Sequence, residues 1–309
     1  HVNETVDVTP ASYIDVTQYF LMDEPSQFGT AVRIPLSQLV TFTDGVSFNI
    51  SLESFEIANA IAISGTPGGD GKAMVLDITT GALRDIAGNL IQPATNITVV
   101  ERPDITPPVP FNATIFYETG IVLIEANEPL DLTPTTYVNL ENIQIGAVSD
   151  TCDNANYPEI CTLLGATVAI VNDSFTATIQ LTEKQRVAAI AISGTPGGDG
   201  SAARVDAKAH FIRDISQNNN TGQFNLEAVE VPDLLQPSGT GATIDLNDGT
   251  LVISMSEIID TTPESSVDVS LIKIHNPEII TVRLKKCQDF IGDTTCEFGA
   301  AVDPIRLRI

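Results

Sequence analysis

The chain has 309 residues, and 40 Asp and Glu against 15 Lys and Arg give it a formal net charge of -25. Such an acidic chain repels nucleic-acid phosphates, so no nucleic-acid partner is expected. Hydrophobic residues make up 43% of the chain, which argues against disorder, and no run approaches the about 18 apolar residues of a membrane span.

One repeat recurs along the chain. Residues 60–71 (Ala-Ile-Ala-Ile-Ser-Gly-Thr-Pro-Gly-Gly-Asp-Gly) return unchanged as residues 189–200, and shorter matches continue at the same offset of 129 residues. Identity of this length indicates an internal tandem repeat. We expect repeat 1 over residues 1–106 without its opening strand, a complete repeat 2 over 107–233, and the first half of repeat 3 over 234–309.

Repeat 2 shows the elements of one unit in chain order. A stiff Pro-rich linker precedes two strands joined by a Glu118-Thr-Gly turn. Later, Thr182 is the predicted N-cap of one or two helical turns that end near Ile192. The segments predicted as strands from their alternating or apolar pattern are 113–124 (a pair), 138–145, 166–171, 175–181, 203–205 and 225–231. This number of short strands predicts an all-β fold, a β-sandwich with a short helical turn in each repeat.

The four cysteines form two matched pairs. Cys152 and Cys161 in repeat 2, and Cys287 and Cys296 in repeat 3, are each separated by eight residues within polar loops. Zinc sites more often have closer spacings and further Cys or His ligands, so two local disulfides are the preferred interpretation. Disulfides place the chain in an oxidising compartment, outside the cell or at its surface.

Six Asn-x-Ser/Thr sequons agree with that compartment. They fall at different positions of the repeats, which predicts N-linked glycans spread over the surface and a secreted glycoprotein. The sequon residues are Asn3, Asn49, Asn96, Asn112, Asn172 and Asn219.

Acidic residues recur between the copies and suggest a calcium site. The linker Asp and the Arg-Asp-Ile loop are expected at one end of a sandwich, where clustered oxygen ligands can hold Ca²⁺. The alternative is that these residues form turns and solubilise the chain, with Asp214 partly neutralised by Arg213. No cofactor is required in either case. The candidate ligands in repeat 2 are Glu128, Asp131, Asp199, Asp214, Asn218 and Asp233, and their counterparts in repeat 1 include Glu4, Asp7, Asp70, Asp85, Asn89 and Asp104.

Enzymatic activity is not expected. The repeated Gly-rich loop resembles a phosphate-binding loop only superficially, because Ala73 stands where Ser or Thr is needed and Lys72 becomes Ser201 in the second copy. His210 and His275 lie in different repeats, with no Ser or Cys motif around either.

Three short motifs carry a family resemblance. They are Asp-Ile-Thr-Pro-Pro at 104–108, Asn-Glu-Pro-Leu-Asp at 127–131 and Asp-Ile-Ala-Gly-Asn at 85–89. Together they resemble the Ig-like repeats of bacterial surface-layer and adhesin proteins, which also recur in long extracellular proteins of microbial eukaryotes. The resemblance covers each whole unit, and repeat 2 departs from it at Ser216-Gln217-Asn218. It implies tandem Ig-like sandwiches with a structural, adhesive or spacer role.

The expected function is therefore an extracellular structural glycoprotein that assembles head to tail into a fibre or surface array. The alternative is a cell-surface adhesin that binds a glycan or protein through loops at the sandwich ends. Repeat 1 lacks an opening strand, whereas repeat 3 has one over residues 242–254 and ends in an alternating segment, 304–309. We therefore expect strand exchange between copies of the chain, with one continuous covalent array as the main alternative.

Overall fold

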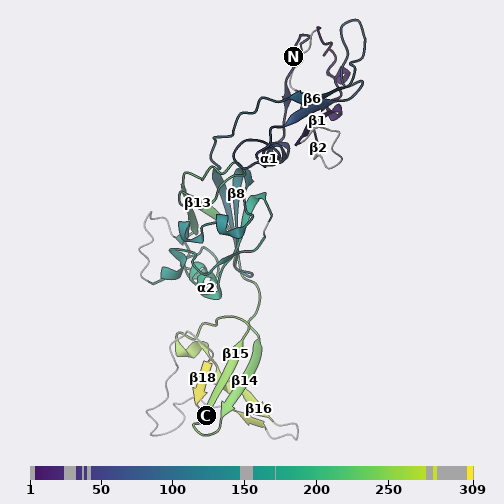
Figure 1. Ribbon diagram of the computed structural model, residues 1–309. Coiled ribbons are helices and arrows are strands. Elements are labelled where there is room, and N and C mark those ends of the chain that lie inside the picture. Colours follow the sequence, from purple (N-terminus) through teal and green to yellow (C-terminus); the bar gives the residue numbers. More distant parts are fainter. Residues whose placement is uncertain are drawn as a thin grey trace. The chain divides into compact units, whose positions relative to one another are not determined.

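The computed structural model describes residues 4–23, 33–36, 38–39, 43–146, 156–170, 172–275, 281–283 and 305–308. The chain forms two compact units, His1–Asp233 and Leu234–Ile309 (Figure 1). The second unit begins where repeat 3 was predicted to begin. The predicted boundary between repeats 1 and 2 lies inside the first unit.

Repeat 1 contains a four-stranded sheet in the order β2-β1-β5-β6 and a separate β3-β4 pair. Tyr19, Leu21 and Ile78 are among the side chains of its apolar core. Its elements are the 3-10 helices η1 (Ala11–Tyr13) and η2 (Val16–Gln18), the strands β1 (Tyr19–Met22), β2 (Arg33–Pro35), β3 (Gln38–Leu39) and β4 (Ile50–Ser51), the helix α1 (Ser54–Ala62), and the strands β5 (Val75–Ile78) and β6 (Ala94–Thr98).

Repeat 2 forms a seven-stranded sheet in the order β10-β11-β8-β7-β13-β12-β9. All of its neighbouring strands are antiparallel except β13 and β7, which are parallel. Its elements are β7 (Pro110–Phe116), β8 (Ile121–Leu130), η3 (Thr135–Tyr137), η4 (Leu140–Asn142), β9 (Ile143–Gly146), η5 (Pro158–Ile160), β10 (Thr167–Val168), β11 (Ser174–Gln180), α2 (Glu183–Ala191), β12 (Arg204–Ala207) and β13 (Gln223–Val231).

The second unit contains a three-stranded sheet, β14-β15-β18, and a β16-β17 pair. The alternating segment near its end forms the predicted strand, but this strand pairs with β15 of its own unit. Its elements are β14 (Gly239–Asp245), β15 (Thr250–Met255), η6 (Glu264–Ser266), η7 (Val269–Leu271), β16 (Lys273–His275), β17 (Thr281–Arg283) and β18 (Ile305–Arg308).

The sequence repeat is also a repeat of structure. Helices α1 and α2 occupy the same nine positions of their repeats, and β5 and β12 the same four. A cis Thr-Pro peptide bond occurs at the corresponding place in each copy, before Pro10, Pro134 and Pro263. The described residues are mostly strands in sheets with few helices, so the all-β class is confirmed. The finer assignment to Ig-like sandwiches stays a prediction.

The predicted strand over residues 138–145 is wrong for most of its length. Residues 140–142 form the 3-10 helix η4, and only Ile143 onward belongs to a strand. The side chain of Asn139 accepts the N–H of Glu141 at 3.1 Å, which favours a turn despite the alternating pattern. By contrast, the helix predicted after Thr182 is confirmed, since Thr182 and Gln185 form a reciprocal capping box.

Cys161 is disulfide-bonded. Cys152, Cys287 and Cys296 lie outside the described residues, so the predicted pairings stay predictions. None of the helices in the described parts of the chain has the length and apolar character needed to cross a membrane.

Five of the six sequon residues lie in the described ranges. Asn49, Asn96, Asn172 and Asn219 are exposed and Asn112 is half-buried, whereas Asn3 lies outside these ranges. The exposed residues are accessible for a glycan, and their occupancy stays a prediction.

Candidate functional site at the junction of repeats 1 and 2

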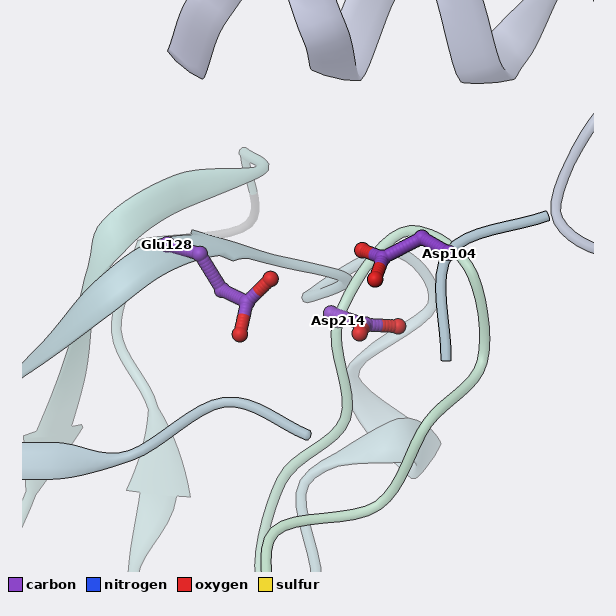
Figure 2. Close-up of side chains that lie close together, drawn as sticks. All are labelled: Asp104, Glu128 and Asp214. Carbon is purple, nitrogen blue, oxygen red and sulfur yellow. The ribbon is translucent and has the colours of Figure 1, made fainter. Parts of the chain in front are cut away.

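Three carboxylates from different parts of the chain meet where repeat 1 joins repeat 2. Asp104 comes from the linker, Glu128 from β8, and Asp214 from the loop that follows β12. One oxygen atom of each lies within 4.8 Å of the other two. Figure 2 shows the Glu128 side chain extending from its strand toward the loop that carries Asp214, with Asp104 beside it.

A tight turn positions Asp214. Its two carboxylate oxygens accept the backbone N–H of Asn218 at 2.8 Å and the side-chain amide of Asn218 at 2.9 Å. Gln217 has a φ of 71°, in the left-handed region where the equivalent Gly88 of repeat 1 has 85°. The turn is therefore the same in both repeats, although repeat 2 departs here from the Ala-Gly-Asn motif.

The same asparagine connects the turn to the linker. The side-chain amide of Asn218 also donates to the carbonyl of Asp104 at 3.2 Å. The Asp104 carboxylate accepts the N–H of Thr106 at 2.9 Å, which fixes the local bend of the linker. Hydrogen bonds within the turn and the linker thus position Asp214 and Asp104. Glu128 is positioned by its place in β8.

The three carboxylates line a cavity of about 300 Å³ beneath α1. The side of repeat 1 contributes Ser54, Ile57, Ala58 and Ile61 of α1, and the side of repeat 2 contributes Asn127, Pro129, Ile215 and Ser216, with Thr106 from the linker. Among the described residues, no lysine or arginine lines the cavity, and no ion pair includes any of the three carboxylates.

The cavity is acidic, and one of its carboxylates is fully buried. Asp214 is only 2% exposed, and burial raises the pKa of its carboxyl even though hydrogen bonds from Asn218 oppose the change. Burial also raises the pKa of Glu128 to about 7, and the nearby charges of Asp214 and Asp104 add to the effect. The negative charge of Asp104 thus disfavours the ionisation of both Glu128 and Asp214.

Two polar atoms at this site have no hydrogen-bond partner among the residues that the structure describes. They are Oε1 of Glu128 and the hydroxyl of Ser216, a residue that is 3% exposed. Buried polar atoms are nearly always paired, because an unpaired one loses its hydration without compensation. These two atoms are therefore candidates for contact with a bound group.

The other predicted ligands lie elsewhere. Asp131 forms an ion pair with Arg213 at 2.7 Å, and the guanidinium of Arg213 lies 3.4 Å from the centroid of the Tyr137 ring. Arg213 thus pairs with Asp131. The alternative to a calcium site that was drawn from the sequence had Arg213 neutralise Asp214. Asp233 pairs with Arg186 at 2.7 Å, and Asp199 is exposed and accepts the N–H of Ser201.

The structure brings together only part of the predicted set, and its role as a calcium site stays a prediction. Glu128, Asp214 and Asn218 come together, but the linker carboxylate that joins them is Asp104, which precedes repeat 2, and not Asp233, which follows it. Asp104 stood among the recurring acids but was assigned to repeat 1. In repeat 1, Asp7 pairs with Arg84 at 2.7 Å, and Asp85 accepts from Asn89 in the same type of turn as Asp214.

Comparisons of the chain with protein families, with curated proteins and with solved structures find no match in any of the three. The interpretation of the junction therefore depends on its own geometry.

Proposed function

We propose that the chain is an extracellular structural glycoprotein whose units assemble head to tail into a fibre or surface array. The repetition of one unit along the chain, a disulfide at Cys161 and exposed sequon residues support this proposal. The observation that carries it is the pairing between the first and last strands of a repeat.

In repeat 2 the opening strand β7 and the closing strand β13 lie side by side in parallel, with Thr114 opposite Val229 and Phe116 opposite Val231. Among the described residues, the other two repeats each contain one strand of this pair. The closing strand β6 is at the edge of the sheet of repeat 1, and the opening strand β14 is at the edge of the sheet in the second unit.

Apolar side chains in β14 and directly after it are uncovered. Ile244 is 43% exposed and Leu246 is 84% exposed. Their counterparts in repeat 2, Ile115 and Tyr117, are fully buried. An edge strand with exposed apolar side chains is a template for another strand.

A second copy supplies a strand of the required type. If β14 of one copy pairs with residues 99–102 of another, the segment that directly follows β6, in the register of β7 on β13, Thr243 lies opposite Val100 and Asp245 lies opposite Arg102. The second of these is an opposite-charge pair. The two surfaces differ, so the contact is heterologous and leads to an open filament.

Paired cysteines test this register. We expect the double variant Val100→Cys with Thr243→Cys to form a ladder of cross-linked chains under mild oxidation, seen on a non-reducing gel. The matched control is Thr114→Cys with Val229→Cys, which occupies the same register within repeat 2 and should cross-link inside one chain. Cross-linking of the control with only monomer in the test variant would contradict strand exchange and favour repeats joined along one chain.

The glycoprotein part of the proposal has a separate test. We expect intact-mass measurement of protein from secreting eukaryotic cells to show a mass above 32.9 kDa that falls on glycosidase treatment. Peptide mapping then assigns the occupied asparagines. A mass equal to that of the bare chain would contradict the glycoprotein proposal.

A further inference from the structure

We propose that Asp104, Glu128 and Asp214 bind one Ca²⁺ ion, which fixes repeat 1 to repeat 2. The ion would lie between the linker, β8 and the Asp214 turn (Figure 2). This inference does not depend on strand exchange, because all three ligands belong to one chain and one compact unit.

The spacing of the carboxylates fits one ion. Ca²⁺ takes six to eight oxygen ligands at about 2.3–2.6 Å, so two ligands on opposite sides of it are about 5 Å apart. The three oxygens here all lie within 4.8 Å of one another. They can therefore share one ion, and water or neighbouring oxygens would complete its shell.

The unpartnered atoms are an independent observation that points to a ligand. Oε1 of Glu128 is buried without a partner, and Ser216, which lines the same cavity, has a buried hydroxyl without a partner. A carboxylate oxygen needs a donor or a cation, and neither is supplied by the described residues around it. A bound cation would satisfy Glu128 directly, and a water molecule of its shell could reach Ser216.

Next to the segment that follows repeat 2, an arginine lies in the place where we propose the ion after repeat 1. Asp233 is the counterpart of Asp104, and it pairs with the buried guanidinium of Arg186 on α2. The residue of α1 that corresponds to Arg186 is Ile57, which lines the acidic cavity. After repeat 2, Arg186 neutralises the linker residue Asp233. After repeat 1, Ile57 cannot neutralise Asp104, so the charge of Asp104 is left for a cation from solution.

Titration calorimetry on the full chain, after removal of metal with a chelator, tests the proposal. We expect one tight equivalent of Ca²⁺, with Mg²⁺ bound at least about tenfold more weakly, because Mg²⁺ demands a stricter octahedral geometry. Glu128→Gln and Asp104→Asn should each weaken this equivalent at least about tenfold, since each removes a charged ligand. Asp199→Asn is the matched control. Its exposed carboxylate lies outside the cluster, and binding should be unchanged.

Two results would overturn the proposal. One is the absence of a tight equivalent in the parent chain. The other is equal binding by the parent and both ligand variants, which would place the calcium elsewhere on this acidic surface.

A second variant tests the role of the ion independently of ligand loss. Ile57→Arg reproduces at the first junction the residue that pairs with Asp233 at the second. We expect it to lose the tight equivalent and to keep, without calcium, the melting temperature that the parent reaches only with calcium. An unchanged calcium affinity in a folded Ile57→Arg protein would show that no ion lies next to Asp104.

Discussion

Gly68 of repeat 1 lies directly against the backbone carbonyl of Ile215 in repeat 2. A Cβ atom at Gly68 would be 1.9 Å from that oxygen, far inside van der Waals contact. The Gly-rich loop of repeat 1 is therefore a contact surface of the junction. The adjacent Gly69 and Gly198 have a different role, because a Cβ there would lie 2.1 Å from a carbonyl of their own loop.

Alanine substitutions at Gly68 and at its counterpart Gly197 separate two destabilising effects, which are backbone strain within the loop and collision with the neighbouring repeat. Gly68 and Gly197 have almost the same φ, 91° and 94°, so alanine at either position costs about 1–2 kcal/mol in backbone strain. Only Gly68→Ala also collides with the neighbouring repeat, which adds about 1–3 kcal/mol. We expect chemical denaturation to show the larger loss for Gly68→Ala. Equal losses in the two variants would mean that the loop does not contact Ile215 in solution.

Gln217 has a backbone conformation that favours glycine. Its φ of 71° is costly for a residue with a Cβ, and its side chain is exposed. We therefore expect Gln217→Gly to raise the free energy of unfolding by about 1 kcal/mol. Gly88→Gln, the reverse exchange at the equivalent turn, should lower it by a similar amount, since the space around Gly88 is open. Denaturant melts measure both, and a destabilised Gln217→Gly would contradict the expectation.

Arg186 is the most deeply buried cation among the described ion pairs. Its guanidinium donates to Asp233 at 2.7 Å, to Glu183 at 2.7 Å and to the carbonyl of Tyr117 at 2.9 Å. Arg186→Ile leaves these acceptors without their donor, and we expect a loss of about 3–5 kcal/mol in thermal or chemical unfolding.

The exposed pair of Arg204 with Glu227 provides the comparison. Glu227 is 66% exposed, so Arg204→Met should cost no more than about 1 kcal/mol. Similar losses for Arg186→Ile and Arg204→Met would show that burial does not strengthen the first pair.

The pairing of Cys161 can be established by peptide mapping without reduction. We expect Cys161 to be linked to Cys152, because the short loop between them needs only a local turn to bring the two residues within bonding distance. Mass spectrometry of the unreduced digest should contain this linked peptide, and reduction should remove it. A peptide that links Cys161 to repeat 3 would contradict the local pairing.

The sequence predicted the repeat and many of its elements because these depend on local patterns. The capped helix after Thr182 and the hairpin around Glu118 were predicted from short-range signals, and both were confirmed. The segment from residue 138 was misread because its alternation of apolar and polar residues is also compatible with a 3-10 turn, η4. A turn stabilised by one side-chain acceptor, such as Asn139, overrides a weak alternating pattern.

The composition and the repeated segments were thus sufficient to determine that this chain is an acidic, folded, all-β repeat protein. They could also name the recurring carboxylates, since repetition within one chain is visible without any coordinates. Which carboxylates meet was decided only by the tertiary structure. Asp104 precedes Asp214 by 110 residues and reaches it because the linker bends onto the end of the next repeat, where Asn218 holds it. Asp131 and Asp233 look equivalent to these residues in the sequence, but each faces an arginine, and only the three-dimensional packing places that neutralising charge.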